Sequence, residues 1–126
     1  MAQNNLVAAL AYLFGWVSGL IVFFISKEDG FARFHGMQSI LLNIAMFLLS
    51  IVCVVVIFVI SMVLGIITAV LNLGAISGIL FIVPWGILVL FMLLLLLVWL
   101  WTMVQAFMGN WFKLPIIGNM AENWSR

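Results

Sequence analysis

The chain is organised around the stretch Phe31-Ala32-Arg33-Phe34-His35-Gly36-Met37-Gln38-Ser39. This stretch gathers several of the few polar side chains of an otherwise apolar sequence at the start of a long helical run. Of the 126 residues, 69% are hydrophobic and 6% are charged. Because soluble domains contain only roughly 45–50% apolar residues, this composition indicates an integral membrane protein.

Three apolar blocks predict three transmembrane helices, at about residues 6–26, 34–71 and 79–108. A span needs roughly 20 apolar residues to cross a hydrocarbon core of about 30 Å, so the second and third helices are unusually long. Residues 109–126 mix aromatic, glycine, proline and charged residues, which predicts a short interfacial C-terminal segment. The expected fold is an all-α integral membrane protein, a bundle of three transmembrane helices in a single domain over residues 1–126.

Small residues follow one face of the first block at helical spacing: Ala8, Ala11, Gly15 and Gly19. In lipid, small residues let two helices approach closely, because packing rather than exclusion of water drives their association. Packing against the other helices of the same chain is favoured over a homodimer seam.

The basic residues predict the orientation of the chain in the membrane. With three spans, Lys27 and Arg33 lie on the same side as Lys113 and Arg126, and the other side has no Lys or Arg. Because positively charged flanks are retained in the cytoplasm, we expect the N-terminus outside and the C-terminus in the cytoplasm.

Polar side chains recur along one narrow sector of the second block, which holds His35, Ser39, Asn43, Met46 and Ser50, with Gln38 and Leu42 flanking it. Polar groups exposed to lipid are costly, so this stripe should face other helices or a hydrated cavity. Gln105 in the third block is expected at a depth where it meets Gln38 or His35. Two interpretations stay open: a polar cleft that opens to the cytoplasm, or hydrogen bonds between helices that hold the bundle together.

The residues that carry chemistry are scarce. His35 is the only histidine and Cys53 the only cysteine, whereas a zinc or haem site needs further ligands. No nucleophile triad or phosphate loop is present, and all three carboxylates lie outside the predicted spans. We therefore expect no enzyme activity, no cofactor and no metal; an enzyme or redox carrier using His35 is the least favoured interpretation. A net charge of +1 without a basic run also argues against nucleic acid as a partner.

Two segments resemble the signatures of the Tic-twenty-like family: Phe31 through Ser39, and a C-terminal set comprising Ala106 through Gly109, Leu114-Pro115, Ile117-Gly118 and Ala121-Glu122. That family includes the channel subunit of the chloroplast inner-envelope protein translocon and small bacterial and archaeal membrane proteins. The prokaryotic members are the closer match, so the resemblance implies a prokaryotic plasma membrane, whereas protein transport is the role of the chloroplast member. The positions that it marks are Phe34, His35, Gln38, Ser39, Gly109, Leu114, Pro115 and Gly118. Together with Arg33, Asn43 and Gln105, these residues form the candidate cleft or partner site.

The function expected from these observations is association within the membrane. We expect a scaffold or accessory subunit of a larger membrane complex, whose partners are the lipid bilayer and other membrane subunits or further copies of itself. The alternative is a homo-oligomeric pore or carrier for protein, peptide or a small solute, with the stripe from His35 to Ser50 lining its path.

Overall fold

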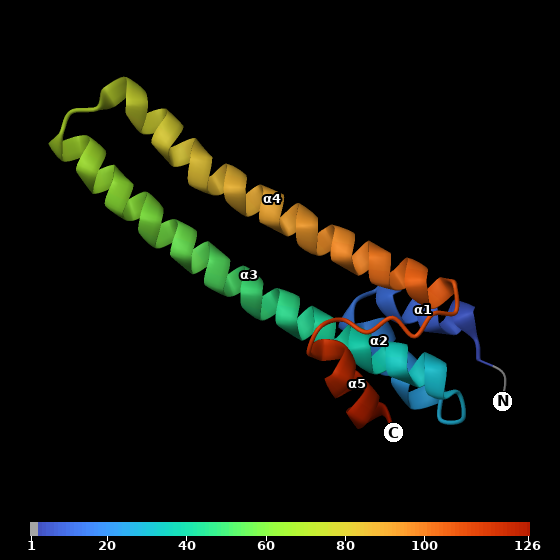
Figure 1. Ribbon diagram of the computed structural model, residues 1–126. Helices are drawn as coiled ribbons and strands as arrows, with labels where there is room; N and C mark the ends of the chain where they lie inside the picture. The colour runs from blue at the N-terminus through green and yellow to red at the C-terminus, as the bar shows by residue number, and fades with distance from the viewer. Residues whose placement is uncertain (1–2) are drawn as a thin grey trace. The chain divides into compact units, whose positions relative to one another are not determined.

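The computed structural model describes residues 3–126, which fold into five α-helices without a strand (Figure 1). The helices are α1 (Asn5–Leu13), α2 (Trp16–Ile25), α3 (Gly30–Val70), α4 (Gly74–Phe107) and α5 (Ile117–Ser125). Residues 1 and 2 of the predicted single domain lie outside the described residues. The packing defines two compact units: a first unit formed by the chain up to Met46 together with Leu97–Arg126, and a second unit formed by Phe47–Leu96.

Among residues 3–126, two helices are long and apolar enough to cross a membrane: α3, with 41 residues, and α4, with 34. At 1.5 Å per residue they extend about 62 Å and 51 Å, well beyond a hydrocarbon core of about 30 Å. The all-α class and two unusually long helices are thus confirmed. Both begin about four residues before the predicted starts.

The predicted first span is wrong, because residues 6–26 form two short helices. The chain turns at Gly15, which adopts a φ of +67°, a conformation that costs glycine little. The Ser18 hydroxyl stabilises the turn, since it accepts a hydrogen bond from the Phe14 N–H at 3.0 Å and donates one to the Ala11 carbonyl at 2.9 Å. The apolar length of residues 6–26 therefore suggested a single span, although the chain reverses direction within this segment.

Hydrogen bonds at the two ends of this helix pair show that the chain, after α1 and α2, comes back close to the point at which α1 begins. The Asn4 N–H donates to Asp29 Oδ2 at 2.7 Å, so residues that flank the predicted span are neighbours. The Gln3 side-chain amide also donates to the Gly109 carbonyl at 3.2 Å. Helices of 9 and 10 residues reach only about 15 Å, roughly half of the hydrocarbon core.

The helix pair rests on the start of α3 through glycine contacts. A Cβ atom built on Gly19 would lie 2.9 Å from the Gly36 carbonyl oxygen, and one built on Gly36 would lie 2.9 Å from the Gly19 carbonyl oxygen. Ala8 and Ala11 are completely buried. The small residues of the first block therefore pack within the chain, as expected.

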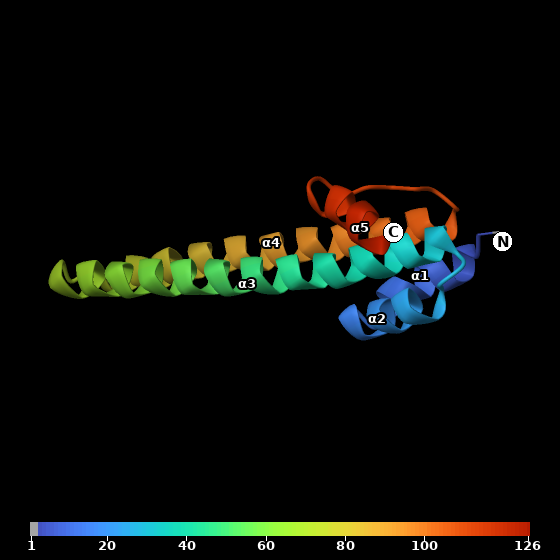
Figure 2. The same cartoon turned by 90° about the horizontal axis from the view of Figure 1, so that it is seen from below.

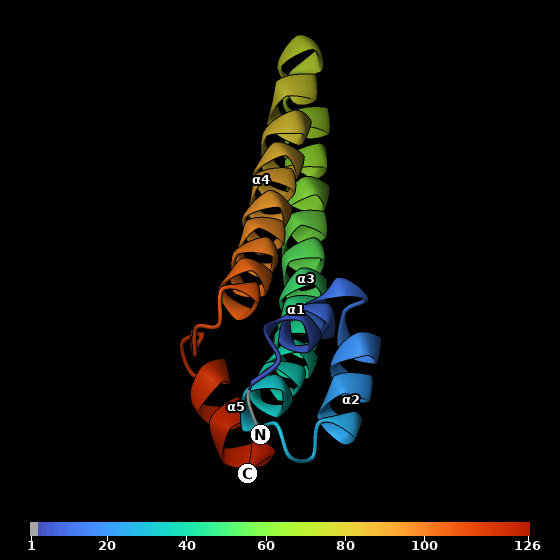
Figure 3. The same ribbon diagram turned by 90° about the vertical axis from the view of Figure 1, so that its right-hand side faces the viewer.

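In the first unit, α5 and the α1–α2 pair lie on opposite sides of the first turns of α3 (Figures 2 and 3). The predicted interfacial segment thus ends in a helix, which begins after Ile116 and buries Gly118 and Ala121. An irregular segment precedes α5; we call residues 108–116 the strap.

The second unit is an antiparallel helical hairpin whose turn contains Asn72 in the left-handed conformation, with φ +52°. The ring of Phe81 approaches Gly65, where an added Cβ would lie 3.1 Å from it. Many of its apolar side chains are exposed, including Phe58 at 60% and Ile82 at 71%. An exposed apolar surface of this kind suits lipid rather than water.

Candidate functional site

A buried hydrogen-bond network joins α1, α3 and the strap in the first unit. Tyr12, His35 and Gln38 are each completely buried. The Tyr12 hydroxyl lies 2.8 Å from His35 Nδ1, and His35 Nε2 lies 3.0 Å from the Asn110 carbonyl oxygen. Because a carbonyl only accepts, Nε2 carries the proton; Nδ1 then accepts from the Tyr12 hydroxyl. Both ring nitrogens of His35 are therefore engaged in hydrogen bonds, and this arrangement accommodates the neutral imidazole.

Gln38 completes the network with all of its polar atoms. Its Nε2 donates to the Tyr12 hydroxyl at 3.0 Å and to the Phe112 carbonyl at 2.9 Å. Its Oε1 accepts from the Leu114 N–H at 3.2 Å. The side chains of α3 therefore hold the strap by its backbone groups, and the network leaves no open position for a ligand at His35 or Gln38.

The predicted stripe continues along α3 through Ser39 and Asn43, and it faces protein. The Ser39 hydroxyl donates to the Gly15 carbonyl at 3.2 Å, which supports the turn between α1 and α2. The Asn43 amide donates to the Ser39 carbonyl of its own helix at 2.8 Å. Because Ser39 is completely buried with His35 and Gln38, the geometry favours the packing interpretation of the stripe over an open cleft.

Arg33 and Phe34 attach other parts of the first unit to the start of α3. Arg33 Nε donates to the Ser125 carbonyl at 2.6 Å, and its guanidinium lies 4.1 Å from the centre of the Phe23 ring. Phe34 is completely buried, with its ring 5.3 Å from that of Trp111. Arg33 therefore links α5 and α2 to α3.

We expected Gln105 to meet Gln38 or His35, but its side chain makes no hydrogen bond to either of them among the described residues. Its Oε1 instead accepts from Asn110 Nδ2 at 2.7 Å. The Asn110 carbonyl in turn accepts a hydrogen bond from His35 Nε2. Gly109, with φ +82°, turns the chain from α4 into the strap.

The remaining predicted site residues lie at the end of the strap. Leu114 is buried and Pro115 is exposed. Gly118 packs against the backbone of Lys113, where an added Cβ would lie 2.7 Å from the Lys113 Cα. The Lys113 ammonium lies 2.5 Å from a carboxylate oxygen of Glu122, and this hydrogen bond lowers the pKa of Glu122. These contacts of Lys113 with Gly118 and Glu122 hold the strap against α5.

Three contributors were missed by the sequence reasoning: Tyr12, Asn110 and Trp99. Trp99 donates from its indole nitrogen to the Tyr12 carbonyl at 2.7 Å. Tyr12 had a usable signal, because it is the only tyrosine and a buried hydroxyl in an apolar helix needs a partner. Asn110 had no signal for its contact with His35, because that contact uses its backbone carbonyl.

The described residues offer little for metal chemistry. No group of three or more His, Cys, Asp or Glu side chains lies close enough within residues 3–126 to hold a metal ion. Cys53, in the second unit, is a free thiol.

Relatives of the chain are archaeal membrane proteins. A UPF0132 membrane protein of Methanocaldococcus jannaschii is 32% identical over 126 residues, covering 98% of this chain and 90% of that protein. A second UPF0132 membrane protein of the same organism is 29% identical over 124 residues, covering 98% and 71%. One from Archaeoglobus fulgidus is 28% identical over 120 residues, covering 95% and 93%. No solved structure matches the chain.

The family model that matches corrects the expected family. The model of the magnetosome magnetite crystal formation protein family, MamF/MmsF, matches residues 3–121. The Tic-twenty-like assignment is wrong: it rested on short motifs such as Phe34-His35 and Leu114-Pro115, of which Phe34, His35 and Leu114 here make contacts between α3 and the strap. The chain is a membrane protein and belongs to the magnetosome magnetite crystal formation protein family.

Proposed function

We propose that the protein acts by association within the membrane, as a scaffold or accessory subunit of a larger membrane complex. The observation that carries this proposal is the closed network of Tyr12, His35 and Gln38, in which three buried polar side chains of the first unit are used to hold the chain together. The second unit adds a long apolar surface suited to lipid and to other transmembrane helices.

The family name refers to magnetite crystal formation, which raises the question of direct contact with iron. Carboxylate oxygens would be the natural ligands for such ions. This chain has three carboxylates, Glu28, Asp29 and Glu122, and none between Asp29 and Glu122. The proposal therefore assigns the chain a role within the membrane that supports such an assembly, rather than a mineral-binding surface of its own.

A pore of several copies remains the alternative, and it needs polar groups that face a path. His35, Gln38 and Ser39 are unsuited to that task, because their hydrogen bonds go to α1, to the turn at Gly15 and to the strap. The scaffold is therefore preferred over the pore.

Purification from the native membrane tests the proposal. Cross-linking before extraction in mild detergent, followed by affinity purification of a C-terminally tagged chain, is expected to yield at least one foreign membrane subunit in fixed ratio. The same tag on an unrelated two-span protein controls for non-specific capture. A particle that contains this chain alone and passes ions or peptides after reconstitution would contradict the scaffold and favour the pore.

We also propose a topology of two crossings with both termini in the cytoplasm. The motive is the pair of hydrogen bonds that brings Gln3 to Gly109 and Asn4 to Asp29. All four basic residues belong to the first unit and the second unit has none, so positive flanks favour the cytoplasmic side for the first unit.

Cysteine accessibility tests this topology in intact cells. In a Cys53→Ser background, Asn72→Cys is expected to react with a membrane-impermeant maleimide added outside, because Asn72 lies in the turn between α3 and α4. Gln3→Cys is expected to react only after the cells are opened. Labelling of Gln3→Cys from outside would instead restore the orientation first predicted, with the N-terminus outside.

A further inference from the structure

The turn between α1 and α2 lies at a level that can be measured along α3. The Ser39 hydroxyl donates to the Gly15 carbonyl at 3.2 Å, and a Cβ atom built on Gly15 would lie 3.0 Å from Asn43 Oδ1. Asn43 follows Phe31, in the first turn of α3, by 12 positions. At 1.5 Å per residue, the tip of the α1–α2 pair lies about 18 Å along α3, little more than half of a hydrocarbon core of about 30 Å.

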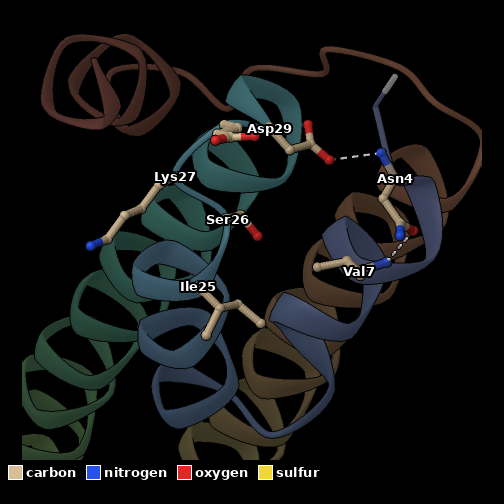
Figure 4. Close-up of a pocket in the computed structure, with 7 residues that line it drawn as sticks. Asn4, Val7, Ile25, Ser26, Lys27 and Asp29 are labelled. Atoms are coloured by element: carbon tan, nitrogen blue, oxygen red, sulfur yellow. Dashed lines mark hydrogen bonds between the residues drawn. The ribbon is translucent and has the colours of Figure 1, made fainter. Parts of the chain in front are cut away.

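The open end of the pair lies at the level where α3 begins. The chain enters α1 and leaves α2 side by side, joined by the hydrogen bond from the Asn4 amide to Asp29, and the Lys27 ammonium points away from the pair (Figure 4). The exposed Trp111 lies at this level as well, with its ring centre 5.2 Å from that of Phe31. Because tryptophan and charged side chains favour the membrane surface over its interior, this end of the first unit marks the surface.

Between these two levels, α1 and α2 present apolar side chains outward. Phe14, at the tip, is 74% exposed, and Trp16, Ile21 and Phe24 of α2 are each more than half exposed. An outward surface of this composition suits lipid rather than water. The pair therefore lies within the leaflet beside the polar end of the first unit, and it ends near the middle of the bilayer.

The opposite leaflet holds fewer helices. In the first unit α4 lies beside α1, since Trp99 donates to the Tyr12 carbonyl, so the four helices α1 to α4 share one leaflet. Beyond Asn43, α3 continues for about 40 Å to Val70, and in the second unit its neighbour among the described residues is α4 alone. With helices of similar diameter, about 10 Å, the described chain displaces about twice as much lipid area in one leaflet as in the other.

We propose that the protein binds preferentially to curved membrane, with the leaflet that holds α1 and α2 on the convex side. A surplus of inserted helices in one leaflet is accommodated best where curvature spreads the lipids of that leaflet apart. With the topology proposed above, the convex leaflet is the cytoplasmic one, which is the curvature of an invagination or of a vesicle whose outer face meets the cytoplasm. The inference rests on that two-crossing topology and goes beyond the scaffold role.

Reconstitution of the full-length chain into vesicles of two sizes tests the curvature preference. A Cys53→Ser, Gln3→Cys chain is reconstituted in a lipid mixture that yields both sizes, which are then separated. Vesicles of about 30 nm diameter are expected to carry about threefold more protein per lipid than vesicles of about 200 nm. An impermeant maleimide added outside should label about 80% of the chains in small vesicles, whose outer leaflet is convex, and about half in large ones.

A matched pair of charge substitutions tests whether the depth of the tip causes this preference. Phe14→Lys places an ammonium near the middle of the bilayer, where charge is costly, so the tip should withdraw toward the surface and the enrichment should fall to about 1.5-fold or less. Ile25→Lys makes the same charge change at a similarly exposed residue beside the surface, where the ammonium reaches water, and should keep the parent enrichment. Both variants are first checked for the helix content and particle size of the parent chain.

The outcomes separate the curvature preference from the topology on which it rests. Equal protein density on the two vesicle sizes, or equal labelling of Gln3→Cys on both, would overturn the curvature preference, and so would an enrichment of Phe14→Lys as large as that of Ile25→Lys. The size comparison on the parent chain stands whatever the variants do. In a chain that carries both Gln3→Cys and Asn72→Cys, the topology allows external labelling of one cysteine or the other; labelling of both in one molecule would contradict the topology itself.

Discussion

Replacing Gln38 by leucine is expected to destabilise the protein by about 3 kcal/mol, because leaving a buried polar group unpaired costs about 1–3 kcal/mol. The variant leaves the Leu114 N–H and the Phe112 carbonyl without the partner that holds them. Tyr12 loses one of its two side-chain bonds as well. The free energy of unfolding in mixed detergent micelles, followed by tryptophan fluorescence, measures the effect.

Matched variants separate the network from a general loss of packing. Gln105→Leu removes a single hydrogen bond, to Asn110, and is expected to cost about 1 kcal/mol. A double-mutant cycle between Gln38→Leu and Tyr12→Phe should show a coupling energy of about 1 kcal/mol, since the two side chains are in contact. A cost for Gln38→Leu no larger than that for Gln105→Leu would show that the network does not hold the strap.

Replacing Gly36 by alanine is expected to destabilise the packing of α2 on α3 by about 3 kcal/mol, the upper part of the range for overpacking. The added Cβ would lie 2.9 Å from both the Gly19 carbonyl oxygen and the Phe23 backbone nitrogen. Backbone atoms cannot move aside as the end of a flexible side chain can, so α2 itself must shift. Unfolding free energy, together with a spin-label distance between α2 and α3, measures both consequences.

Gly86→Ala is the matched control for this experiment. Gly86 lies inside α4, and apart from the nearby backbone of its own helix no described atom lies within 4 Å of its added Cβ. Alanine is favoured over glycine in a helix interior by about 0.5–1 kcal/mol, so this variant should be neutral or slightly stabilising. If Gly36→Ala behaves like Gly86→Ala, the close approach of the two helices is not required for stability.

The sequence was sufficient to predict what depends on local composition. The runs that became α3 and α4 are apolar over a length that only a membrane or a very large core would accommodate, so their existence and ends were predicted to within about five residues. The stripe of His35, Gln38 and Ser39 was found because a polar group in a lipid-embedded helix needs a partner, whatever that partner is.

The remaining features depend on tertiary contacts that local composition does not carry. Residues 6–26 have the length and apolarity of a span, and their turn at Gly15 is held by Ser39 from a different helix and lies against the Asn43 side chain. The partners of His35 and Gln38 in the strap lie about 75 positions away. Because those partners are peptide groups, which every residue has, no side-chain pattern could identify them.

This mode of anchorage also determines how freely the strap can change during evolution. The strap is held through the carbonyls of Asn110 and Phe112 and the amide of Leu114, groups that survive nearly any substitution. Proline at position 114 is the exception, because it has no N–H, and Pro115 stands one position beyond the required donor. The strap can therefore accumulate substitutions while its attachment to α3 persists, so that related chains could keep the same closure with few residues in common.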